Sequence, residues 1–397
     1  MDNDSREKKI RLMSEQERET TVRFYRHLHR HPELSFEEQR TSALVAEELR
    51  KLGYRVRERA GKFGVIADLE GAADGPTVAL RADMDALPIE EETGLPFAST
   101  VPGVMHACGH DAHTAMLLVA ARILASHRGE LRGRLRLLFQ SAEEINAGAK
   151  AMIGDGGLEG VAEIYGLHNW PALPAGVAAV KEGALMGAVD RLDIEVRGRG
   201  GHGAIPDLAA DPIVASSAVV LALQTAVSRE LSPFEPSVVT IGSFHGGHAN
   251  NVIPDRSLLT GTVRTLSPKA RADIRGKLIR LISKTAEAYN CSAEVEYTEQ
   301  VPAVINDSGC AVAVREALVR TFGTERVRTA DPTMAGEDFA VYQERVPGCF
   351  FWIGSGPKQG SEAAYGLHHP KFRIDEDCLP AGVAALVSIA LARLAPS

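Results

Sequence analysis

The sequence predicts a two-domain α/β protein, in which a smaller α/β sandwich is inserted into a domain built on a mainly parallel sheet. At 397 residues the chain is longer than a single hydrophobic core usually supports. Up to about residue 180, strand patterns alternate with helical patterns, as in a parallel sheet covered by helices. Near Met186 the pattern changes to strands with a period of two, typical of a sheet with one solvated face. We therefore expect one domain of residues 1–185 and 302–397 and an inserted domain of residues 186–301.

The first domain is expected to begin with helical sequence over residues 15–52. This stretch contains three histidines near Pro32, which we interpret as structural or solvated: His27, His29 and His31. Apolar runs then predict three buried strands, at residues 78–88, 135–141 and 162–167. After the insertion, residues 334–342 are predicted as a helix, 348–354 as a strand and 379–394 as an apolar closing helix.

The inserted domain has its own order of elements. Residues 189–197 alternate apolar and polar side chains and predict a strand. The pattern continues as a helix, two strands, a helix and a strand, at residues 211–231, 237–244, 257–265, 268–289 and 292–300. This βαββαβ order describes a complete small sandwich.

Composition narrows the class of protein. Hydrophobic residues make up 45% and charged residues 24%, as in an ordinary globular protein. We expect no apolar run of membrane-spanning length and no secretory signal at the start, and hence a cytoplasmic location. The five cysteines are odd in number and scattered, which indicates reduced thiols rather than a disulfide framework. A net charge of −8 disfavours a nucleic-acid partner.

The segment Met105–Asp111 places a thiol and an imidazole one residue apart at the start of a predicted helix. Cys108 and His110 are donors that zinc-like ions prefer, and they can bind one ion or bridge two. Taken alone, the segment is explained equally well by a reduced core cysteine beside surface histidines.

Other possible donors follow predicted strands. They are Asp83 and Asp85 at the exit of the first strand, Glu143 and Glu144 after the second and His168 after the third, with a fourth candidate at His368 and His369 near the end of the chain. Each has an ordinary alternative, such as acidic residues at a helix start or histidines in a turn. Because ligands of open α/β sheets bind outside the carboxyl ends of the strands, these four segments and the Cys108 segment together predict a metal site at one edge.

These motifs resemble the M20 metallopeptidase and amidohydrolase family, in the branch that contains N-acyl-amino-acid amidohydrolases, hippurate hydrolases and auxin-conjugate hydrolases. The similarity covers essentially the whole chain. The matching segments are residues 26–37, 81–88, 105–111, 142–144, 200–206, 251–254, 261–264, 335–339 and 368–370.

The resemblance implies two divalent ions, a zinc-peptidase-like catalytic domain and an inserted lid and dimerisation domain. Cys108 would be shared by or adjacent to both ions, which a thiolate biases toward zinc, nickel or cobalt, although manganese also serves the family. The other implied ligands are His110, Glu144, His168 and His368, with His369 as the competing choice at the last position. Glu143 would be the general base, and Asp85, with Asp83 sharing the role, would orient a ligand imidazole.

The inserted domain supplies the remaining implied groups. His202 would stabilise the oxyanion, often from a partner protomer, and Asn251 and Arg264 would hold the substrate's carboxylate. The implied assembly is a homodimer or higher homo-oligomer.

We therefore predict a metal-dependent enzyme that hydrolyses the amide bond of small N-acyl amino acids, similar to aminoacylases and hippurate hydrolases. The alternatives are a dipeptidase or carbamoyl-amide hydrolase on the same scaffold, and a non-catalytic homologue that binds metal or ligand. The presence of Glu143 with a complete donor set counts against the non-catalytic alternative. A structural zinc site is disfavoured because such sites use four ligands at local spacing, whereas these span Cys108 to His368.

Overall fold

The computed structural model describes residues 3–357 and 365–394, which divide into two compact units. Unit 1 comprises the described parts of Met1–Gly183, Ile305–Asp331 and Asp338–Ser397. Unit 2 comprises Ala184–Val304 and Pro332–Glu337. The chain therefore enters unit 2 a second time, through a short segment that the sequence pattern did not indicate. The strands β7 (Gly183–Met186) and β14 (Val304–Asn306) pair with each other where the chain changes unit.

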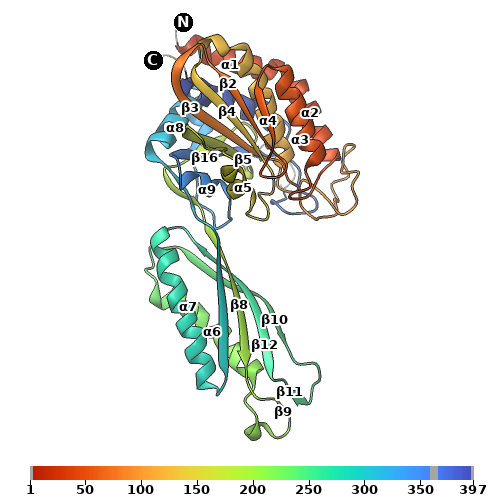
Figure 1. The fold of residues 1–397 in the computed structure, drawn as a ribbon, viewed down its shortest axis with the longest axis vertical. Coiled ribbons are helices and arrows are strands. Elements are labelled where there is room, and N and C mark those ends of the chain that lie inside the picture. The colour runs from red at the N-terminus through yellow and green to blue at the C-terminus, as the bar shows by residue number, and fades with distance from the viewer. Residues whose placement is uncertain (1–2, 358–364, 395–397) are drawn as a thin grey trace. The chain divides into compact units, whose positions relative to one another are not determined.

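Unit 1 is built on an eight-stranded sheet with the order β1-β2-β4-β3-β5-β16-β6-β15 (Figure 1). The four central strands run parallel to one another, while β1, β2 and the β16–β6 pair are antiparallel. The predicted α/β class with a mainly parallel sheet is confirmed. The strands are β1 (Arg55–Ala60), β2 (Gly64–Glu70), β3 (Ala73–Asp83), β4 (Arg132–Gln140), β5 (Val161–Pro174), β6 (Ala178–Val180), β15 (Val327–Thr329) and β16 (Gly348–Gly356).

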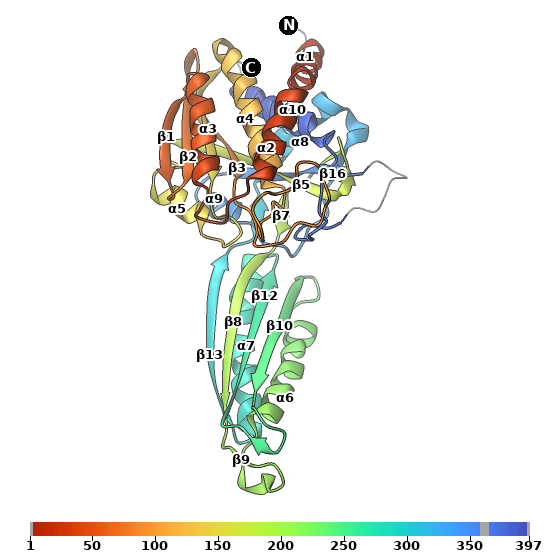
Figure 2. The same ribbon diagram turned by 90° about the vertical axis from the view of Figure 1, so that its right-hand side faces the viewer.

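Helices cover this sheet on both faces (Figure 2). One group packs around α4 and α10 and encloses the main hydrophobic core, and α5 and α9 pack on each other against β4, β5 and β16. The helices are α1 (Asn3–Gln16), α2 (Arg18–Arg30), α3 (Gln39–Lys51), α4 (His110–Ser126), α5 (Gly148–Gly154), α8 (Ser308–Phe322), α9 (Phe339–Gln343) and α10 (Cys378–Leu394), with 3-10 turns η1 (Arg128–Glu130) and η4 (Thr324–Arg326).

The predicted helix over residues 15–52 is two helices, because Pro32 lies in the connection between α2 and α3. The helix predicted over residues 334–342 is limited to α9, which begins at Phe339. Helix α1 was not predicted, since its sequence is mostly charged and lacks an apolar stripe.

Unit 2 contains a four-stranded antiparallel sheet with the order β10-β12-β8-β13 and two helices that pack on it. The order of strands and helices is the βαββαβ pattern read from the sequence. Both helices begin with a capped turn: Asp211 accepts the N–H of Ile213, and Ser267 accepts the N–H of Ala270. The elements are β8 (Ala188–Arg197), β9 (Gly201–His202), η2 (Pro206–Leu208), α6 (Pro212–Thr225), η3 (Ala226–Glu230), β10 (Ser237–Gly246), β11 (Val252–Ile253), β12 (Arg256–Thr265), α7 (Pro268–Ala288) and β13 (Ser292–Val301).

The helical run of α6 and η3, Pro212–Glu230, is long and apolar enough to cross a membrane by length and composition alone. The expectation that no run reaches that length was therefore wrong. The residues Ala215, Val219 and Leu223 of this run are buried in the core of unit 2. A core helix passes the same test of length and composition, so the run is weak evidence for a membrane span.

A buried ionic contact links α2 to the start of α4 in unit 1. His29 is 1% exposed, with Nδ1 2.6 Å from Oδ2 of Asp111 and Nε2 3.1 Å from Oε1 of Glu91. Burial alone would lower the pKa of His29, but the hydrogen bonds to Asp111 and Glu91 raise the pKa to about 9. The structural role predicted for the histidine cluster holds for His29, whereas His27 is exposed.

This contact predicts a dependence of stability on pH. Because the folded pKa of His29 lies above the unfolded value of 6.5, its contribution is complete below pH 6.5 and is lost as the pH rises through about 9. The shift corresponds to roughly 3 kcal/mol. We expect the free energy of urea unfolding to fall between pH 6 and pH 9.5 by about this much more in the parent than in His29→Asn. His27→Asn is the control, and an equal fall in the parent and His29→Asn would refute the assignment.

Candidate metal centre and active site

The turn that carries Cys108 and His110 is set by a close backbone approach. Gly109 has a φ of +88°, and a Cβ added there would lie 2.2 Å from Nδ2 of Asn169. The same Asn169 amide donates to the carbonyl of Cys108 at 2.6 Å. Glycine is therefore required at this position both for its φ and for space. The turn places Cys108 two residues before α4, Gly109 at the N-cap and His110 at the first residue of the helix.

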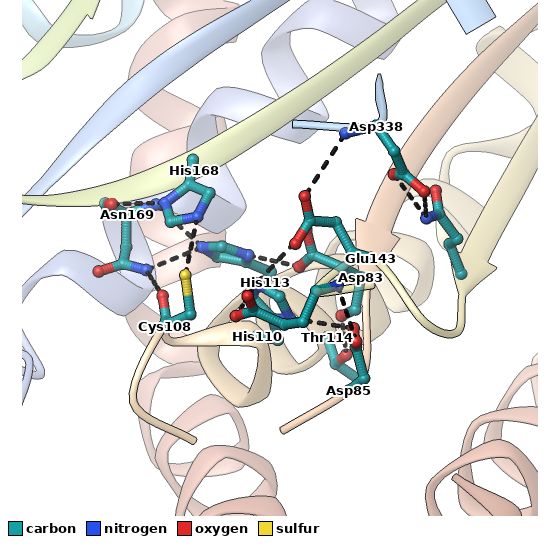
Figure 3. A network of polar contacts seen from close by, with 12 residues as sticks. Asp83, Asp85, Cys108, His110, His113, Thr114, Glu143, His168, Asn169 and Asp338 are labelled. Atoms are coloured by element: carbon teal, nitrogen blue, oxygen red, sulfur yellow. Dashed lines mark hydrogen bonds and ion pairs between the residues drawn. The ribbon is translucent and has the colours of Figure 1, made fainter. Parts of the chain in front are cut away.

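The structure brings the five predicted ligands of unit 1 together in two groups that share Cys108. Figure 3 labels three of them, Cys108, His110 and His168. Cys108, His110 and His168 form one group, with Sγ of Cys108 3.4 Å from Nε2 of His168. The second group consists of Cys108, Glu144 and His368, in which Nε2 of His368 is 3.5 Å from Oε1 of Glu144. Within each group the donor atoms lie within 4.8 Å of one another.

The state of these donors fits a pair of bound cations. Nε2 of His110 and Oε1 of Glu144 are buried without a hydrogen-bond partner among the described residues, although they lie 3.8 Å apart. Buried polar atoms of this kind normally have a partner. Burial and the Glu144 carboxylate raise the pKa of the Cys108 thiol well above its usual value, so a nearby cation is needed to make the thiolate. Thiolate, imidazole and carboxylate together suit borderline divalent ions.

Asp85 lies where it can hold the His110 ring. Its Oδ1 is 3.3 Å from Nδ1 of His110, which leaves Nε2 of the same ring directed toward Glu144. Its Oδ2 accepts from the Ser35 hydroxyl at 2.7 Å and from the backbone N–H of Glu144 at 3.0 Å. One carboxylate therefore fixes the ring of one predicted ligand and the backbone of another.

Asp83 contacts a different imidazole. Its Oδ1 is 2.6 Å from Nδ1 of His113, and Nε2 of His113 accepts the backbone N–H of Asn169 at 2.9 Å. Arg81 donates to the other oxygen of Asp83 at 2.6 Å. Burial would raise the pKa of Asp83, but the charges of His110 and Arg81 hold it well below its usual value. Asp83 therefore orients His113, which in turn positions the strand that carries His168.

The loop of Glu143 is held by contacts that the sequence motifs did not indicate. Ala142 has a φ of +56°, an uncommon conformation for alanine. Its N–H donates to Oε1 of buried Glu38 at 2.8 Å, and the N–H of Asp338 donates to Glu143 at 3.4 Å. Burial, with a contribution from Asp85, raises the pKa of Glu38 to about 7. Glu38 stands beside a recognised motif, but no local pattern indicates its contact with a residue 104 positions away.

His168 and His368 are placed differently from a simple strand-exit arrangement. His168 lies inside β5, which continues to Pro174 beside β16 after its pairing with β3 ends at Gly166. His368 has a φ of +65°, and its N–H donates to the carbonyl of Ala107 at 2.8 Å, which ties the last loop to the Cys108 turn. His369 stacks on Tyr365 instead, with ring centroids 4.5 Å apart.

The three predicted residues of unit 2 do not form one cluster. His202 and Asn251 are neighbours, because β9 pairs with β11 and the N–H of Gly203 donates to the Asn251 carbonyl at 2.9 Å. Both are exposed. Arg264 is half-buried on β12 and pairs in register with Val189, near the first residue of β8.

Arg264 and the His202–Asn251 pair lie at opposite ends of the sheet of unit 2. Asn251 precedes Arg256 by five residues, and Arg256 pairs with Arg197 at the other end of β8 from Val189. Figure 1 shows β9 and β11 at this end of the sheet. Eight residues of β8 separate the two positions, or about 26 Å at the usual strand rise. The expectation that Asn251 and Arg264 of one chain hold the same carboxylate is therefore not met within this unit.

Comparison with known proteins identifies the family. The sequence profile of peptidase family M20/M25/M40 matches residues 79–392. The chain belongs to this family. The resemblance predicted from the motifs is thus confirmed.

Two relatives and one solved structure illustrate the match. N-acetyl-L-cysteine deacetylase of Bacillus subtilis (strain 168) is 43% identical over 356 residues, which cover 89% of this chain and 83% of that protein. An IAA-amino acid hydrolase of Arabidopsis thaliana is 42% identical over 369 residues, 92% of this chain and 84% of the relative. The crystal structure of a Bacillus subtilis dinuclear metal binding peptidase from the M20 family has a TM-score of 0.83 and 39% identity, and covers 94% of this chain and 97% of that chain. The chain is accordingly an amide-hydrolysing metallopeptidase of the M20 family.

Proposed function

We propose that the protein hydrolyses the amide bond of N-acyl amino acids at the Cys108 centre of unit 1. The observation that carries this proposal is the pair of donor groups that share Cys108, with a second glutamate, Glu143, beside them. Relatives that act on N-acetylcysteine and on IAA-amino acids support the same bond type. Zinc, nickel, cobalt or manganese would suit the donors.

Two divalent ions held by Cys108, His110, Glu144, His168 and His368 would polarise the scissile carbonyl and acidify the attacking water. The chain's own contribution to the chemistry is a proton acceptor. Glu143 is 7% exposed, and its carboxylate lies with Glu144 and His110 in one further donor group. Because a carboxylate committed to a cation is a poor base, we assign metal binding to Glu144 and proton transfer to Glu143. Glu143 takes the proton from water and later delivers it to the departing amine.

Paired variants separate these two roles. Glu143→Gln removes a proton acceptor but not an assigned ligand, so turnover should fall by about two to four orders of magnitude while metal content stays near that of the parent. Cys108→Ala removes a donor from both groups, so metal stoichiometry or affinity should fall. Metal analysis together with a hydrolysis assay over N-acetyl, N-benzoyl and indole-acyl amino acids measures both. Near-full turnover in Glu143→Gln, or unchanged metal binding in Cys108→Ala, would contradict the respective assignment.

Arg264 is suited to bind the substrate's free carboxylate. Its Nε donates to Thr262 Oγ1 at 3.0 Å, and the guanidinium has no carboxylate within ion-pair distance among the described residues. Burial lowers the pKa of Arg264, which indicates a partly desolvated cation. A substrate carboxylate can pair with such a guanidinium bidentately.

Substrate amidation tests this role. Converting the free carboxylate to an amide should lower kcat/KM by about 10- to 100-fold, because a hydrogen bond to a charged group is worth roughly 1.5–3 kcal/mol. Arg264→Ala should cause a similar loss on the acid and little further loss on the amide. Exchange of acetyl for benzoyl should have a smaller effect, because it keeps the free carboxylate that Arg264 would bind. Equal activity of the parent on acid and amide would favour a broader amidase.

We further propose that the enzyme is a homodimer in which His202 and Asn251 act on the partner's substrate. A small N-acyl amino acid cannot span the length of β8, so one chain cannot offer both ends of its sheet to the same molecule. A second copy can pair with the exposed edge of β10 and with the neighbouring α6. Both carry exposed apolar side chains, including Val214, Leu221 and Val238.

Light scattering coupled to gel filtration tests the assembly. We expect a dimer that Leu221→Lys converts to monomer, with metal content retained and turnover lost. Val312→Lys is the matched control, because Val312 is also an exposed aliphatic residue on a helix, but in unit 1. A parent protein that is monomeric over a wide concentration range, or an active Leu221→Lys monomer, would refute the shared site.

A further inference from the structure

Unit 1 has a groove apart from the metal centre, formed by α2 and the Pro96–Phe97 segment. Its volume is about 640 Å³, within the range of small-molecule sites. The apolar side chains along it include Val22, Pro96 and Phe97. None of its lining residues belongs to the proposed metal centre.

The groove concentrates positive charge on a protein whose net charge is −8. Two of its four arginines are paired: Arg26 makes two hydrogen bonds to Glu376, at 2.7 and 2.8 Å, and Arg18 bonds Glu15 and Asp377. Arg23 and Arg30 have no carboxylate within ion-pair distance among the described residues. Among the described residues that line the groove, Glu19 is the one acidic side chain.

The uncompensated groups share one face of α2. Arg23, His27 and Arg30 follow the i, i+4, i+7 spacing, and His31 is the next residue after the helix. The rings of His27 and His31 lie 5.0 Å apart. One nitrogen of Arg30 donates to the Pro96 carbonyl at 3.0 Å, which holds this arginine across the groove.

The cations repel one another in this arrangement. Burial, and then the charges of His27, Arg40 and Arg30, lower the pKa of His31. The negative end of the α2 dipole stabilises cations in the last turn, but the effect falls off before Arg23. An anion in the groove would relieve the repulsion.

We propose that this groove binds an organic phosphate, with the phosphate between Arg23 and Arg30 and the apolar body against Val22 and Pro96. Guanidinium groups match phosphate oxygens bidentately, and two of them with two imidazoles suit a dianion better than a carboxylate. The ligand would be distinct from the substrate, so the inference does not depend on the proposed amidohydrolase activity.

Calorimetry on the metal-loaded full-length protein, with phenyl phosphate as the probe, measures the binding. Inorganic phosphate and phenol test the two halves of the ligand separately. In parallel, the pKa of His31 is followed by NMR of the histidine ring protons, assigned with His31→Asn. We expect phenyl phosphate to bind more tightly than either fragment and to raise the pKa of His31, because a dianion favours the imidazolium.

Charge-matched variants locate the binding. Arg23→Gln and Arg30→Gln should each weaken phenyl phosphate at least about tenfold, as expected for a lost charge-assisted hydrogen bond. Glu19→Gln should strengthen it, and Arg229→Gln, at an exposed position of unit 2, should leave it unchanged. Binding at the metal centre would be insensitive to Arg23 and would leave His31 unshifted. Either of these two observations would overturn the proposal. It would also be overturned by an absence of saturable binding, by an equal loss of binding in Arg229→Gln, or by inorganic phosphate that binds as tightly as phenyl phosphate.

Discussion

The end of β3 is the point on which the metal centre depends. Asp83 and Asp85 leave this strand in succession, and their four oxygens contact separate parts of unit 1. Asp83 holds His113 of α4, while Asp85 holds the His110 ring and the backbone of Glu144. Buried carboxylates are costly unless every oxygen has a partner, so these contacts are stabilising only when all of the segments are in place. The same requirement fixes the relative positions of the donors.

Arg81 extends this network to the loop of the proposed base. It donates to Asp83 at 2.6 Å and to Asp338 at 3.0 Å, and Gln140 donates to the same Asp338 carboxylate. The N–H of Asp338 reaches Glu143. Burial raises the pKa of Asp338 to about 6 despite the nearby Arg81 charge. Metal donors and base are thus oriented by one continuous buried network rather than by separate local turns, which is how an active site keeps a preorganised geometry.

Much of unit 1 could be predicted because its signals are local. Apolar runs located β3, β4 and β5, and Cys108 and His110 stand out within a few residues of each other. The contacts that complete the site are not local. Glu38 accepts the N–H of Ala142, 104 positions away along the chain, and the position of His168 inside β5 depends on where the pairing of β5 with β3 ends. Neither the contact of Glu38 with Ala142 nor the position of His168 in β5 can be predicted from the periodicity of a single sequence.

The separation of Arg264 from Asn251 also depends on non-local strand pairing, and it bears on how many copies of the chain form the active site. The two residues belong to short motifs that begin only ten positions apart, at residues 251 and 261, and neither motif indicates that they are separated. The strand β12 begins after the first motif and contains the second, and it runs along the whole of β8, so residues close in sequence lie far apart in space. The constraint is geometric: any mechanism that uses both residues on one small substrate must draw them from different copies of the chain. Because of the antiparallel register of β12 on β8, a mechanism that uses both Arg264 and Asn251 requires an oligomer.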